Sequence, residues 1–421
     1  MSNIYIETYG CSNSQAEAEM MAGLLEQAGF KIIKNEKYAD LVIIVTCYVK
    51  SPTEQKILFR IKQFSNKKMI IAGCMPEGLY KKITDTAPEA SLVSTHHIKE
   101  IAQAVEKTLQ GKRIEHLGES DEIKLCLPRI RRNPVIDIVP ISSGCNSACS
   151  YCCVRLAKGK LFSYPKDLIL KEIEFSLKEG CKEIWLTAQD TASYDFGKER
   201  LPGLLNNISK IPGNFFVRVG MMNVRNVIPI ASELMKAFEN KKIYKFVHLP
   251  LQSGSNKVLK EMNRGYTISQ FENVAKAFDS LNCQLWTDII VGYPTEEEED
   301  FLETLEAIKK IRPDWVNVSK FGPRPGTPAA KLKPLPTSVI KERSRLASDL
   351  VREISLEKNR KWIGWVGEIL ISERGKEKYQ WIGRNFAYKP ILIEGRGDLL
   401  GKFLKVRTIE ATPAYLRGEI L

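Results

Sequence analysis

The sequence predicts an α/β protein built from three consecutive domains. Short apolar runs alternate with amphipathic segments over roughly the first 110 residues, and the same alternation returns from residue 134. After residue 361 the pattern changes to short alternating runs between Gly and charged turns. We therefore expect an N-terminal parallel α/β sheet domain (1–110), a linker (111–133), a partial (β/α) barrel of TIM type (134–355) and a small OB-like β-barrel (356–421).

The composition is that of a folded protein with excess positive charge. Of 421 residues, 43% are hydrophobic and 27% are charged, which excludes a disordered chain. The net charge of +13 favours a polyanionic partner, with a solvated basic surface as the alternative. Met1–Gly10 lacks the features of a secretory signal, and no apolar run approaches the roughly 20 residues that span a bilayer. We expect a cytoplasmic protein without membrane contact, in which clustered Cys indicate metal or redox chemistry.

Three apolar runs in the N-terminal domain each lead to a cysteine. Each run precedes an amphipathic segment, which predicts βαβ units and a parallel sheet. The runs and their cysteines are Ile4–Thr8 with Cys11, Leu41–Val45 with Cys47, and Met69–Ala72 with Cys74. The predicted helices are Ala16–Ala28, Thr53–Phe64, Pro76–Ile83 and Ile98–Leu109.

These three cysteines are expected to lie close together. The carboxyl ends of parallel strands share one edge of a sheet, and ligands bind at that edge. Cys11, Cys47 and Cys74 would therefore form a three-thiolate site. The alternative is three ordinary buried cysteines, since Cys is among the most buried residue types.

A basic segment, Lys124–Pro134, joins the first two domains. It reads KLCLPRIRRNP and is interrupted by two prolines. It either braces the interdomain seam or contacts a phosphate backbone, and the sequence leaves both open. Cys126 within it has no partner spacing and is expected to be structural.

A tight loop after the first barrel strand carries three more cysteines. Cys145, Cys149 and Cys152 stand at C-x3-C-x2-C spacing within Gly144–Pro165. Three thiolates on a cluster of four irons leave one iron open, and an open iron can chelate an amine and a carboxylate. S-adenosylmethionine carries both groups beside its sulfonium, and an electron from the cluster can cleave it to a 5′-deoxyadenosyl radical.

Other metal centres fit this loop less well. Zinc would need a fourth Cys or His at finger spacing, and none of the 4 His lies near the loop. The bacterial-ferredoxin pattern C-x2-C-x2-C-x3-C-P is absent. Adjacent Cys side chains in an extended chain point apart, so we expect Cys153 to pack rather than to ligate.

Six strands are predicted in the barrel, fewer than the eight of a closed one. They are Val135–Ile141, Glu183–Thr187, Phe216–Val219, Phe246–Leu251, Leu285–Val291 and Val316–Phe321. Polar residues such as Thr187 and Asp190 collect past the strand ends, where barrel chemistry occurs. His248, Cys181 and Cys283 are expected to be core residues, and no acid–base pair is evident.

A charged helix, Thr337–Lys361, is expected to lead into the C-terminal barrel. Its five predicted strands are Gly367–Ile371, Gln380–Arg384, Lys389–Ile393, Lys402–Ile409 and Tyr415–Ile420. Residues 358–421 carry 13 Lys and Arg against 7 Asp and Glu. Aromatic residues expected to be exposed, interleaved with Arg384 and Lys389, predict a stacking surface for RNA; core aromatics are the alternative. These aromatics are Tyr379, Trp381, Phe386 and Tyr388.

The motifs resemble one enzyme family over nearly the whole chain. GCNSACSYC, with the later GK and SYP, resembles the radical S-adenosylmethionine signature and, more narrowly, the methylthiotransferases. TYGC, VTC and AGCMPE are similar to the N-terminal domain of that family, and IGRNFAYKPILIEG resembles the TRAM domain of RNA-modifying enzymes. The barrel motifs in the family's order are LTAQDT, RVGMMN, HLPLQSGS, MNRGYT, TDIIVGYPTE and RPGTPA.

The resemblance implies cofactors and the residues that hold them. It implies two [4Fe-4S] clusters, an auxiliary one in the N-terminal domain and one in the barrel that binds S-adenosylmethionine. By that likeness the auxiliary ligands are Cys11, Cys47 and Cys74, and the catalytic cluster ligands are Cys145, Cys149 and Cys152. The implied S-adenosylmethionine pocket comprises Tyr151, Gln189, Ser253, Gly254 and Arg264.

The resemblance also implies the reaction, a radical insertion of a methylthio group into a carbon–hydrogen bond. Together with LPRIRRNP and MMN, the loop is most similar to the archaeal and eukaryotic branch, which modifies threonylcarbamoyladenosine at position 37 of tRNA, beside the anticodon. Methylthiolation of isopentenyladenosine in tRNA or of a ribosomal-protein aspartate are alternatives, as is a non-catalytic iron–sulfur RNA-binding protein. The implied partners are the tRNA anticodon stem-loop and a low-potential electron donor such as ferredoxin or flavodoxin.

Overall fold

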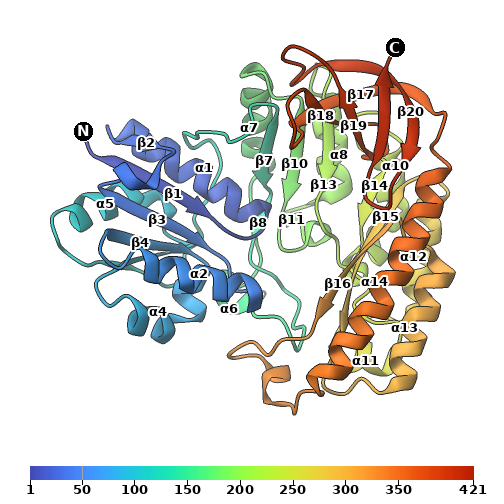
Figure 1. Cartoon of the computed structure of the whole chain (residues 1–421), viewed down its shortest axis with the longest axis horizontal. Coiled ribbons are helices and arrows are strands. Elements are labelled where there is room, and N and C mark those ends of the chain that lie inside the picture. The colour runs from blue at the N-terminus through green and yellow to red at the C-terminus, as the bar shows by residue number, and fades with distance from the viewer. Residues whose placement is uncertain (50) are drawn as a thin grey trace.

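The computed structural model describes residues 1–49 and 51–421. Figure 1 shows the predicted three-part architecture, with the N-terminal sheet on one side, the larger barrel in the centre and the C-terminal β-barrel above it. The sequence-based fold class is thus confirmed. Across the described helices, none is long and apolar enough to cross a membrane.

The N-terminal sheet contains six parallel strands in the order β2-β1-β3-β4-β5-β6. The strands are β1 Asn3–Thr8, β2 Lys31–Ile33, β3 Leu41–Thr46, β4 Lys68–Gly73, β5 Ser91–Ser94 and β6 Glu115–His116. The three strands predicted from apolar runs are the central ones. The sequence analysis missed β2, β5 and β6, because strands of two to four residues provide too little periodicity to detect.

Helices cover both faces of this sheet. They are α1 Ser12–Gln27, α2 Ser51–Gln63, α3 Met75–Gly78, α4 Tyr80–Thr86 and α5 Ile101–Leu109. β3 is completely buried, as expected for a central strand of a sheet covered on both sides. The core on one face also includes Ile136 and Ile138 from the first barrel strand, so the two domains share a hydrophobic core.

The basic linker segment contacts both domains at their seam, one of the two roles left open by the sequence: on the N-terminal side, Ile130 N donates to Glu19 O of α1 at 3.0 Å. Arg129 Nη1 lies 2.8 Å from an Asp137 carboxylate oxygen, and Arg129 Nη2 lies 2.6 Å from Glu172. Arg131 Nε lies 2.9 Å from the same Asp137. Asp137 is completely buried, so these guanidinium groups compensate a charge that would otherwise be costly there.

The central domain is an open barrel of six parallel strands with helices outside. Two three-stranded sheets, β13-β10-β7 and β14-β15-β16, are joined through a parallel bridge between Val217 and Ile243. The strands are β7 Ile136–Pro140, β10 Glu183–Thr187, β13 Phe216–Val219, β14 Phe246–His248, β15 Gln284–Val291 and β16 Trp315–Lys320. The helices are α6 Val154–Lys158, α7 Lys166–Lys178, α8 Leu201–Lys210, α9 Val224–Val227, α10 Ala231–Phe238, α11 Asn256–Glu261, α12 Ile268–Asp279, α13 Glu298–Ile311 and α14 Thr337–Arg360.

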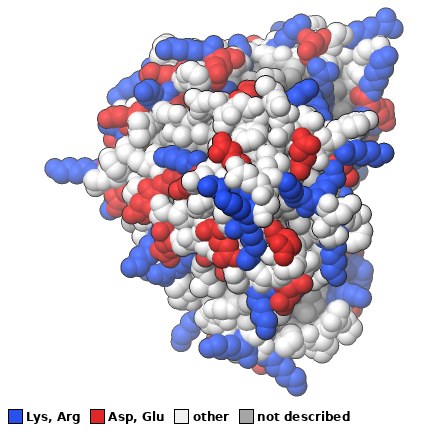
Figure 2. All heavy atoms as spheres, turned by 90° about the vertical axis from the view of Figure 1, so that its left-hand side faces the viewer, with Lys and Arg blue, Asp and Glu red and all other residues white. Residues whose placement is uncertain are grey.

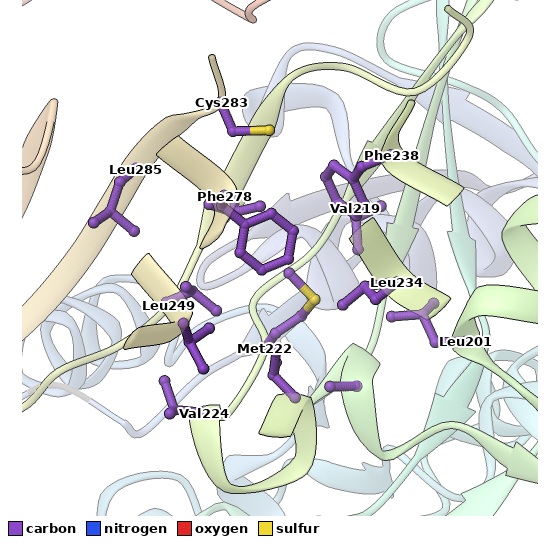
Figure 3. Packing of buried hydrophobic residues seen from close by; sticks show 14 of the residues in the cluster. Leu201, Val219, Met222, Val224, Leu234, Phe238, Leu249, Phe278, Cys283 and Leu285 are labelled. Carbon is purple, nitrogen blue, oxygen red and sulfur yellow. The ribbon is translucent and has the colours of Figure 1, made fainter. Parts of the chain in front are cut away.

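The largest hydrophobic core lies between the strands and these outer helices. In Figure 3, Val219 and Leu249 from the strand side meet Phe238 of α10 and Phe278 of α12 around Met222. The Phe238 and Phe278 rings pack edge to face with centroids 5.3 Å apart. Cys181 and Cys283 are buried, in agreement with their predicted packing role.

The C-terminal domain is a closed five-stranded barrel in the order β17-β18-β19-β21-β20. The strands are β17 Val366–Arg374, β18 Gln380–Arg384, β19 Pro390–Glu394, β20 Phe403–Ala411 and β21 Leu416–Ile420. Two aromatic residues expected at the surface are buried instead: Trp381 and Tyr388 are each only 3% exposed, whereas Tyr379 and Phe386 are exposed. The exposure prediction was wrong for Trp381 because its side chain fills the inside of the barrel.

The turn between β18 and β19 anchors this small barrel to the base of the large one. Lys245 N donates to Phe386 O at 2.8 Å, and Gln284 donates its side-chain amide to Ala387 O. The Tyr388 ring packs against Tyr244 and against Phe246 of β14. Tyr388 is therefore part of a domain interface, which explains its burial.

A buried ion pair reinforces this interface. Asp314 accepts from Lys389 Nζ at 3.0 Å and from Lys358 Nζ at 2.7 Å. Burial raises the pKa of Asp314, but the two lysines more than offset this and hold it below its usual range. Asp314 therefore stays ionised at neutral pH and ties α14 and the β18–β19 turn to the barrel.

Removing one lysine should weaken this interface measurably. We expect Lys389→Ala to lower the free energy of unfolding by about 2 kcal/mol, because Asp314 loses one partner while Lys358 still compensates its charge. Urea unfolding followed by tryptophan fluorescence measures the change. The matched control is Lys402→Ala at an exposed position of the same domain. Equal losses in both variants would contradict the assigned role.

Candidate functional site

Three cysteines lie at the same edge of the N-terminal sheet, as predicted. Cys11 follows β1 and precedes α1, while Cys47 and Cys74 directly follow β3 and β4. These strands are neighbours in the sheet, and their carboxyl ends face the same way. Cys47 and Cys74 are buried, whereas Cys11 is exposed.

A glycine permits the close approach of two of these cysteines. A Cβ atom at Gly10 would lie 2.6 Å from Cys47 Cβ and 3.3 Å from Cys47 Sγ. Gly10 also has a φ of +113°, which side chains rarely tolerate. Gly10 therefore lets the Cys11 loop approach Cys47 closely.

Burial favours the protonated form of the two buried thiols, because it raises the pKa of both Cys47 and Cys74. Burial is the main cause that raises the pKa of Cys74 to about 12; Lys158 opposes this shift, whereas Glu17, Cys47 and Cys11 add to it. The free thiol is therefore protonated at neutral pH, and a metal would have to displace the proton to bind. The donor chemistry fits an iron–sulfur cluster, because the three cysteines follow neighbouring strands at one edge of the sheet and Cys47 and Cys11 both influence the pKa of Cys74.

The second set of cysteines occupies the loop after β7. Cys145 N donates to Gly159 O at 3.2 Å, and Cys152 N donates to Cys149 O at 3.1 Å. A Cβ atom at Gly144 would lie 1.8 Å from Lys160 O, so only glycine allows the loop to close on itself. The start of the loop is thereby held against its end.

Polar groups point at two of these sulfurs. Ser147 N donates to Cys145 Sγ at 3.3 Å, and Arg264 Nη1 donates to Cys149 Sγ at 3.2 Å. Burial raises the pKa of Cys152 to about 12, with further contributions from Cys149 and Cys145. Three thiols with two facing hydrogen-bond donors suit a cluster that binds through thiolates. Within residues 1–49 and 51–421, no group of three His, Cys, Asp or Glu is arranged to hold a metal ion, so ligation by either cysteine set stays a prediction.

Arg264 connects the cysteine loop to the barrel. Besides Cys149, its guanidinium lies 3.4 Å from Tyr151 Oη, 3.2 Å from Asn223 Oδ1 and 3.3 Å from Pro250 O. Arg264 is 6% exposed. It brings a positive charge beside the cysteine sulfur, where a carboxylate ligand would find a partner.

Only some of the residues predicted for the S-adenosylmethionine pocket contact the cysteine loop. Tyr151 and Arg264 lie at the cysteine loop. Gln189 has a buried Oε1 that accepts no hydrogen bond from any described residue. A buried acceptor without a partner is consistent with a ligand-binding role. Ser253 and Gly254 instead contact Thr304 of α13, with Gly254 N donating to its hydroxyl at 2.9 Å.

The two cysteine sets lie on opposite sides of one interdomain seam. Tyr48, next to Cys47, donates its hydroxyl to Cys153 O at 2.9 Å. His96 Nε2 lies 3.2 Å from Ala157 O in α6. The side chain of Cys153 packs in the hydrophobic core of the N-terminal domain, as the sequence analysis expected.

A buried ion cluster holds the seam together. Glu17 of α1 accepts from Lys124 Nζ and from Lys158 Nζ, each at 2.7 Å. Both lysines also donate to the hydroxyl of Thr95, and all four residues are buried. Burial alone would raise the pKa of Glu17, but the two lysines lower it to about 2. The cluster thus ties the linker and the cysteine loop to α1.

Two further contacts were not found from the sequence. Arg324 Nη1 lies 2.6 Å from Glu54 of α2, which links the far side of the barrel to the N-terminal domain. His248 was expected to be a core residue, but its Nε2 lies 2.8 Å from Asp288 and its side chain is 15% exposed. Arg324, His248 and Asp288 lie within RPGTPA, HLPLQSGS and TDIIVGYPTE, so those motifs were the available signal.

Three family models match successive parts of the chain. Residues 3–95 match the uncharacterized protein family UPF0004, residues 139–308 match the radical SAM superfamily and residues 360–421 match the TRAM domain. These segments coincide with the N-terminal sheet, most of the central barrel and the C-terminal barrel.

Several proteins are similar to the chain over its full length. A probable threonylcarbamoyladenosine tRNA methylthiotransferase of Methanothermobacter thermautotrophicus is 42% identical over 99% of each chain. One of Pyrococcus horikoshii is 42% identical over 100% of each chain. The threonylcarbamoyladenosine tRNA methylthiotransferase of Drosophila melanogaster is 35% identical over 99% of this chain and 77% of its own.

Solved structures share the fold at low sequence identity. The radical S-adenosylmethionine methyltransferase TsrM from Kitasatospora setae superposes with a TM-score of 0.59 at 13% identity, covering 78% of this chain and 75% of TsrM. The cobalamin-dependent S-adenosylmethionine radical enzyme OxsB gives a TM-score of 0.56 at 10% identity, covering 84% of this chain and 55% of OxsB. These likenesses support the fold assignment.

Neutralising Glu17 should destabilise the protein. We expect Glu17→Gln to lower the free energy of unfolding at pH 7 by about 3 kcal/mol, because two buried ammonium groups lose their counter-ion. Urea unfolding measures this loss, with Glu26→Gln at the exposed end of α1 as the control. A loss no larger than that of the control would show that the ion cluster does not hold the seam.

The same carboxylate predicts a pH dependence. Its pKa is lowered in the folded protein, so its stabilising contribution is complete above about pH 4.5 and is lost as the pH falls toward about 2. We expect the stability difference between wild type and Glu17→Gln to shrink across this window. Unfolding measured from pH 5 to pH 2.5 tests the trend. A stability difference that grows on acidification would contradict the lowered pKa of Glu17.

Proposed function

The chain belongs to the threonylcarbamoyladenosine tRNA methylthiotransferases, and from this premise we propose that it converts threonylcarbamoyladenosine at position 37 of tRNA to its 2-methylthio derivative by radical S-adenosylmethionine chemistry. It is accordingly a sulfur-group transferase that acts on tRNA adenosine. Its three matched segments correspond to an auxiliary-site domain, a radical domain and an RNA-binding domain.

The placement of both cysteine sets at one seam is the observation that carries this proposal. Tyr48 beside Cys47 bonds to the carbonyl of Cys153, the residue after Cys152. A methylthio transfer needs a sulfur source close to the place where the substrate radical forms. An enzyme with one cysteine set would leave the other without a role.

We assign Cys145, Cys149 and Cys152 as ligands of a [4Fe-4S] cluster, with Arg264 and Tyr151 at its S-adenosylmethionine side. When bound, this cluster and S-adenosylmethionine supply the carbon radical for hydrogen abstraction. Arg264 supplies a fixed positive charge beside Cys149, and Gln189 has a free acceptor at the same end of the strands. These groups would orient the charged methionine end of S-adenosylmethionine.

We assign Cys11, Cys47 and Cys74 to a second [4Fe-4S] cluster. The adjacent ion cluster supports this assignment, because Lys124 and Lys158 carry two positive charges against the single charge of Glu17. The excess positive charge in a buried place favours an anionic occupant nearby. Burial opposes ionisation of the Cys74 thiol, and the charge of Lys158 would help to offset that cost.

The C-terminal barrel is the proposed tRNA-binding domain. Its β17–β18 turn exposes Arg374, Lys376 and Lys378 beside Tyr379, and Lys378 Nζ lies 5.0 Å from the Tyr379 ring centroid. Exposed cations beside an aromatic ring suit stacking and phosphate contacts with RNA. On the face of the molecule in Figure 2, by contrast, basic and acidic side chains are interspersed.

We propose the anticodon stem-loop as substrate, a low-potential donor such as ferredoxin or flavodoxin as reductant, and the cytoplasm as location.

The two cysteine sets should separate two partial reactions. We expect Cys149→Ala to abolish formation of 5′-deoxyadenosine, and Cys47→Ala to keep it while losing the methylthio product. Each variant should lose about half of the bound iron, because one cluster of two is removed. Cys153→Ala is the control and should retain both clusters. The opposite pattern, with cleavage lost in Cys47→Ala alone, would overturn the assignment.

The overall function is tested by mass spectrometry of tRNA nucleosides from cells with and without this gene. We expect loss of 2-methylthio-threonylcarbamoyladenosine and accumulation of its unthiolated precursor. Loss of a methylthio isopentenyladenosine instead would identify isopentenyladenosine as the substrate. No change in any methylthio nucleoside would refute the tRNA activity and direct the search to ribosomal proteins.

A further inference from the structure

A chain of polar side chains crosses the inner face of three neighbouring barrel strands. His248 Nε2 lies 2.8 Å from Asp288 Oδ2, and Asn317 Nδ2 donates to Asp288 Oδ1 at 2.8 Å. Trp315 Nε1 donates to Asn317 Oδ1 at 3.1 Å. The four residues come from β14, β15 and β16, which are adjacent and parallel. We call them the polar relay.

The relay lies on the side of the sheet that the outer helices do not cover. Along β15, Leu285, Ile289 and Val291 are buried in the hydrophobic core, and Asp288 alternates with them on the opposite face. The Asp288 side chain is 22% exposed and that of His248 is 15% exposed. The inner face of a barrel is usually filled by branched apolar side chains. An accessible polar chain there needs a ligand or a mechanism to explain it.

Asp288 fixes the tautomer of the imidazole. A carboxylate accepts hydrogen bonds, so His248 must carry its proton on Nε2 when the ring is neutral. Nδ1 is then a hydrogen-bond acceptor, and no described residue donates to it. Asn317 donates to the other carboxylate oxygen, and Trp315 in turn donates to Asn317 and holds its amide in place. The relay therefore presents one oriented acceptor at the inner face.

Aromatic residues lie on the same strand as His248 and on its neighbour. His248 is paired in register with Trp286, whose ring packs edge to face with Phe246 at 5.3 Å between centroids. The Arg218 guanidinium lies 5.4 Å from the Phe246 centroid and 5.0 Å from that of Trp185. Flat apolar surface next to one oriented polar atom is the usual environment of a bound nucleobase.

The acceptor also lies near the cysteine loop. His248 is two residues before Pro250, and two residues of extended chain span roughly 7 Å. Pro250 O accepts from Arg264, whose other nitrogen contacts Cys149. His248 O accepts from Met222 N at 2.9 Å, one residue before Asn223, which also bonds to Arg264. A ligand at His248 would thus lie close to the radical-generating site.

We propose that the polar relay is the binding site for the target adenine, with His248 Nδ1 accepting a hydrogen bond from the N–H at N6 of the base. This inference rests on the proposed function and specifies where its substrate binds. The base is turned out of the RNA stack, and His248 binds its N6 edge while the aromatic rings limit its movement. His248 binds substrate directly, and Asp288 acts as a positioning residue that sets its tautomer.

The test is a binding cycle with enzyme carrying its clusters. One partner is an anticodon stem-loop with threonylcarbamoyladenosine at the target position, and the other is the same stem-loop with an abasic site there. Fluorescence anisotropy gives both dissociation constants for wild type and for His248→Ala. We expect His248→Ala to weaken binding of the first stem-loop about tenfold and to leave the abasic stem-loop unchanged, since one base contact is lost.

Two more variants separate recognition from packing. His248→Asn places a side-chain oxygen near the position of Nδ1 and should recover most of the lost affinity. Asp288→Asn keeps the shape but offers an N–H to Nε2, which forces the proton onto Nδ1 and removes the acceptor. We expect Asp288→Asn to bind the modified stem-loop as weakly as His248→Ala. His116→Ala, at the edge of the N-terminal sheet, should behave as wild type.

Iron content and reductive cleavage of S-adenosylmethionine are measured on every variant. We expect both to be retained in His248→Ala, while product formed per 5′-deoxyadenosine falls. The proposal is overturned if His248→Ala weakens the binding of both stem-loops equally, or if it weakens the binding of neither. If wild type makes no methylthio product but still shows the base-dependent difference, the proposed function fails and the binding site stands. If product forms and no base-dependent difference exists, the binding site alone is refuted.

Discussion

The arrangement of the two cysteine sets depends on one buried ion cluster, in which Glu17 meets Lys124 and Lys158. The three residues come from the first helix of the N-terminal domain, from the linker and from the end of the cysteine loop. Burial lowers the pKa of Lys158, but Cys74 and Glu17 raise it above its ordinary value, so the charge persists. Opposite charges that cannot separate without being left unpaired in an apolar interior keep the two domains in one orientation. The shared hydrophobic core around Ile138 reinforces that orientation without specifying it.

Much of the fold was predictable because its main signals are local. Each of the strands β1, β3 and β4 contains a short apolar run that is followed within a few residues by a cysteine, and parallel pairing then brings the three strand ends to one edge. The short outer strands were missed because they lack such a run. The ion cluster was missed for a different reason: Glu17 and Lys158 are 141 residues apart, and no spacing in the sequence relates them. The cysteine positions were thus predictable, whereas the contacts that fix their orientation were not.

Residues on the inner face of a barrel are harder to interpret than those in its hydrophobic core. Alternation along β15 separates Asp288 from Leu285 and Ile289, but it does not reveal which face of the strand is covered. The same ambiguity explains two opposite errors. His248 was assigned to the core but is partly exposed and paired with a carboxylate, whereas Tyr388 was assigned to the surface but fills a domain interface. Both assignments depend on how separate elements meet in space, which a local pattern does not encode.

The anchored turn between β18 and β19 fixes the position of the C-terminal barrel relative to the large barrel. Phe386, Ala387 and Tyr388 fix the C-terminal barrel to the base of the large barrel, and the Asp314 ion pair locks the same junction. The exposed Arg374 to Tyr379 turn is therefore at a constant distance from the ends of the barrel strands. In the proposed complex, an RNA bound by the small barrel would therefore present to the strand ends the nucleotide that lies at a fixed distance from its contact with that barrel. Position along the RNA can thus be selected by geometry, without reading the bases in between.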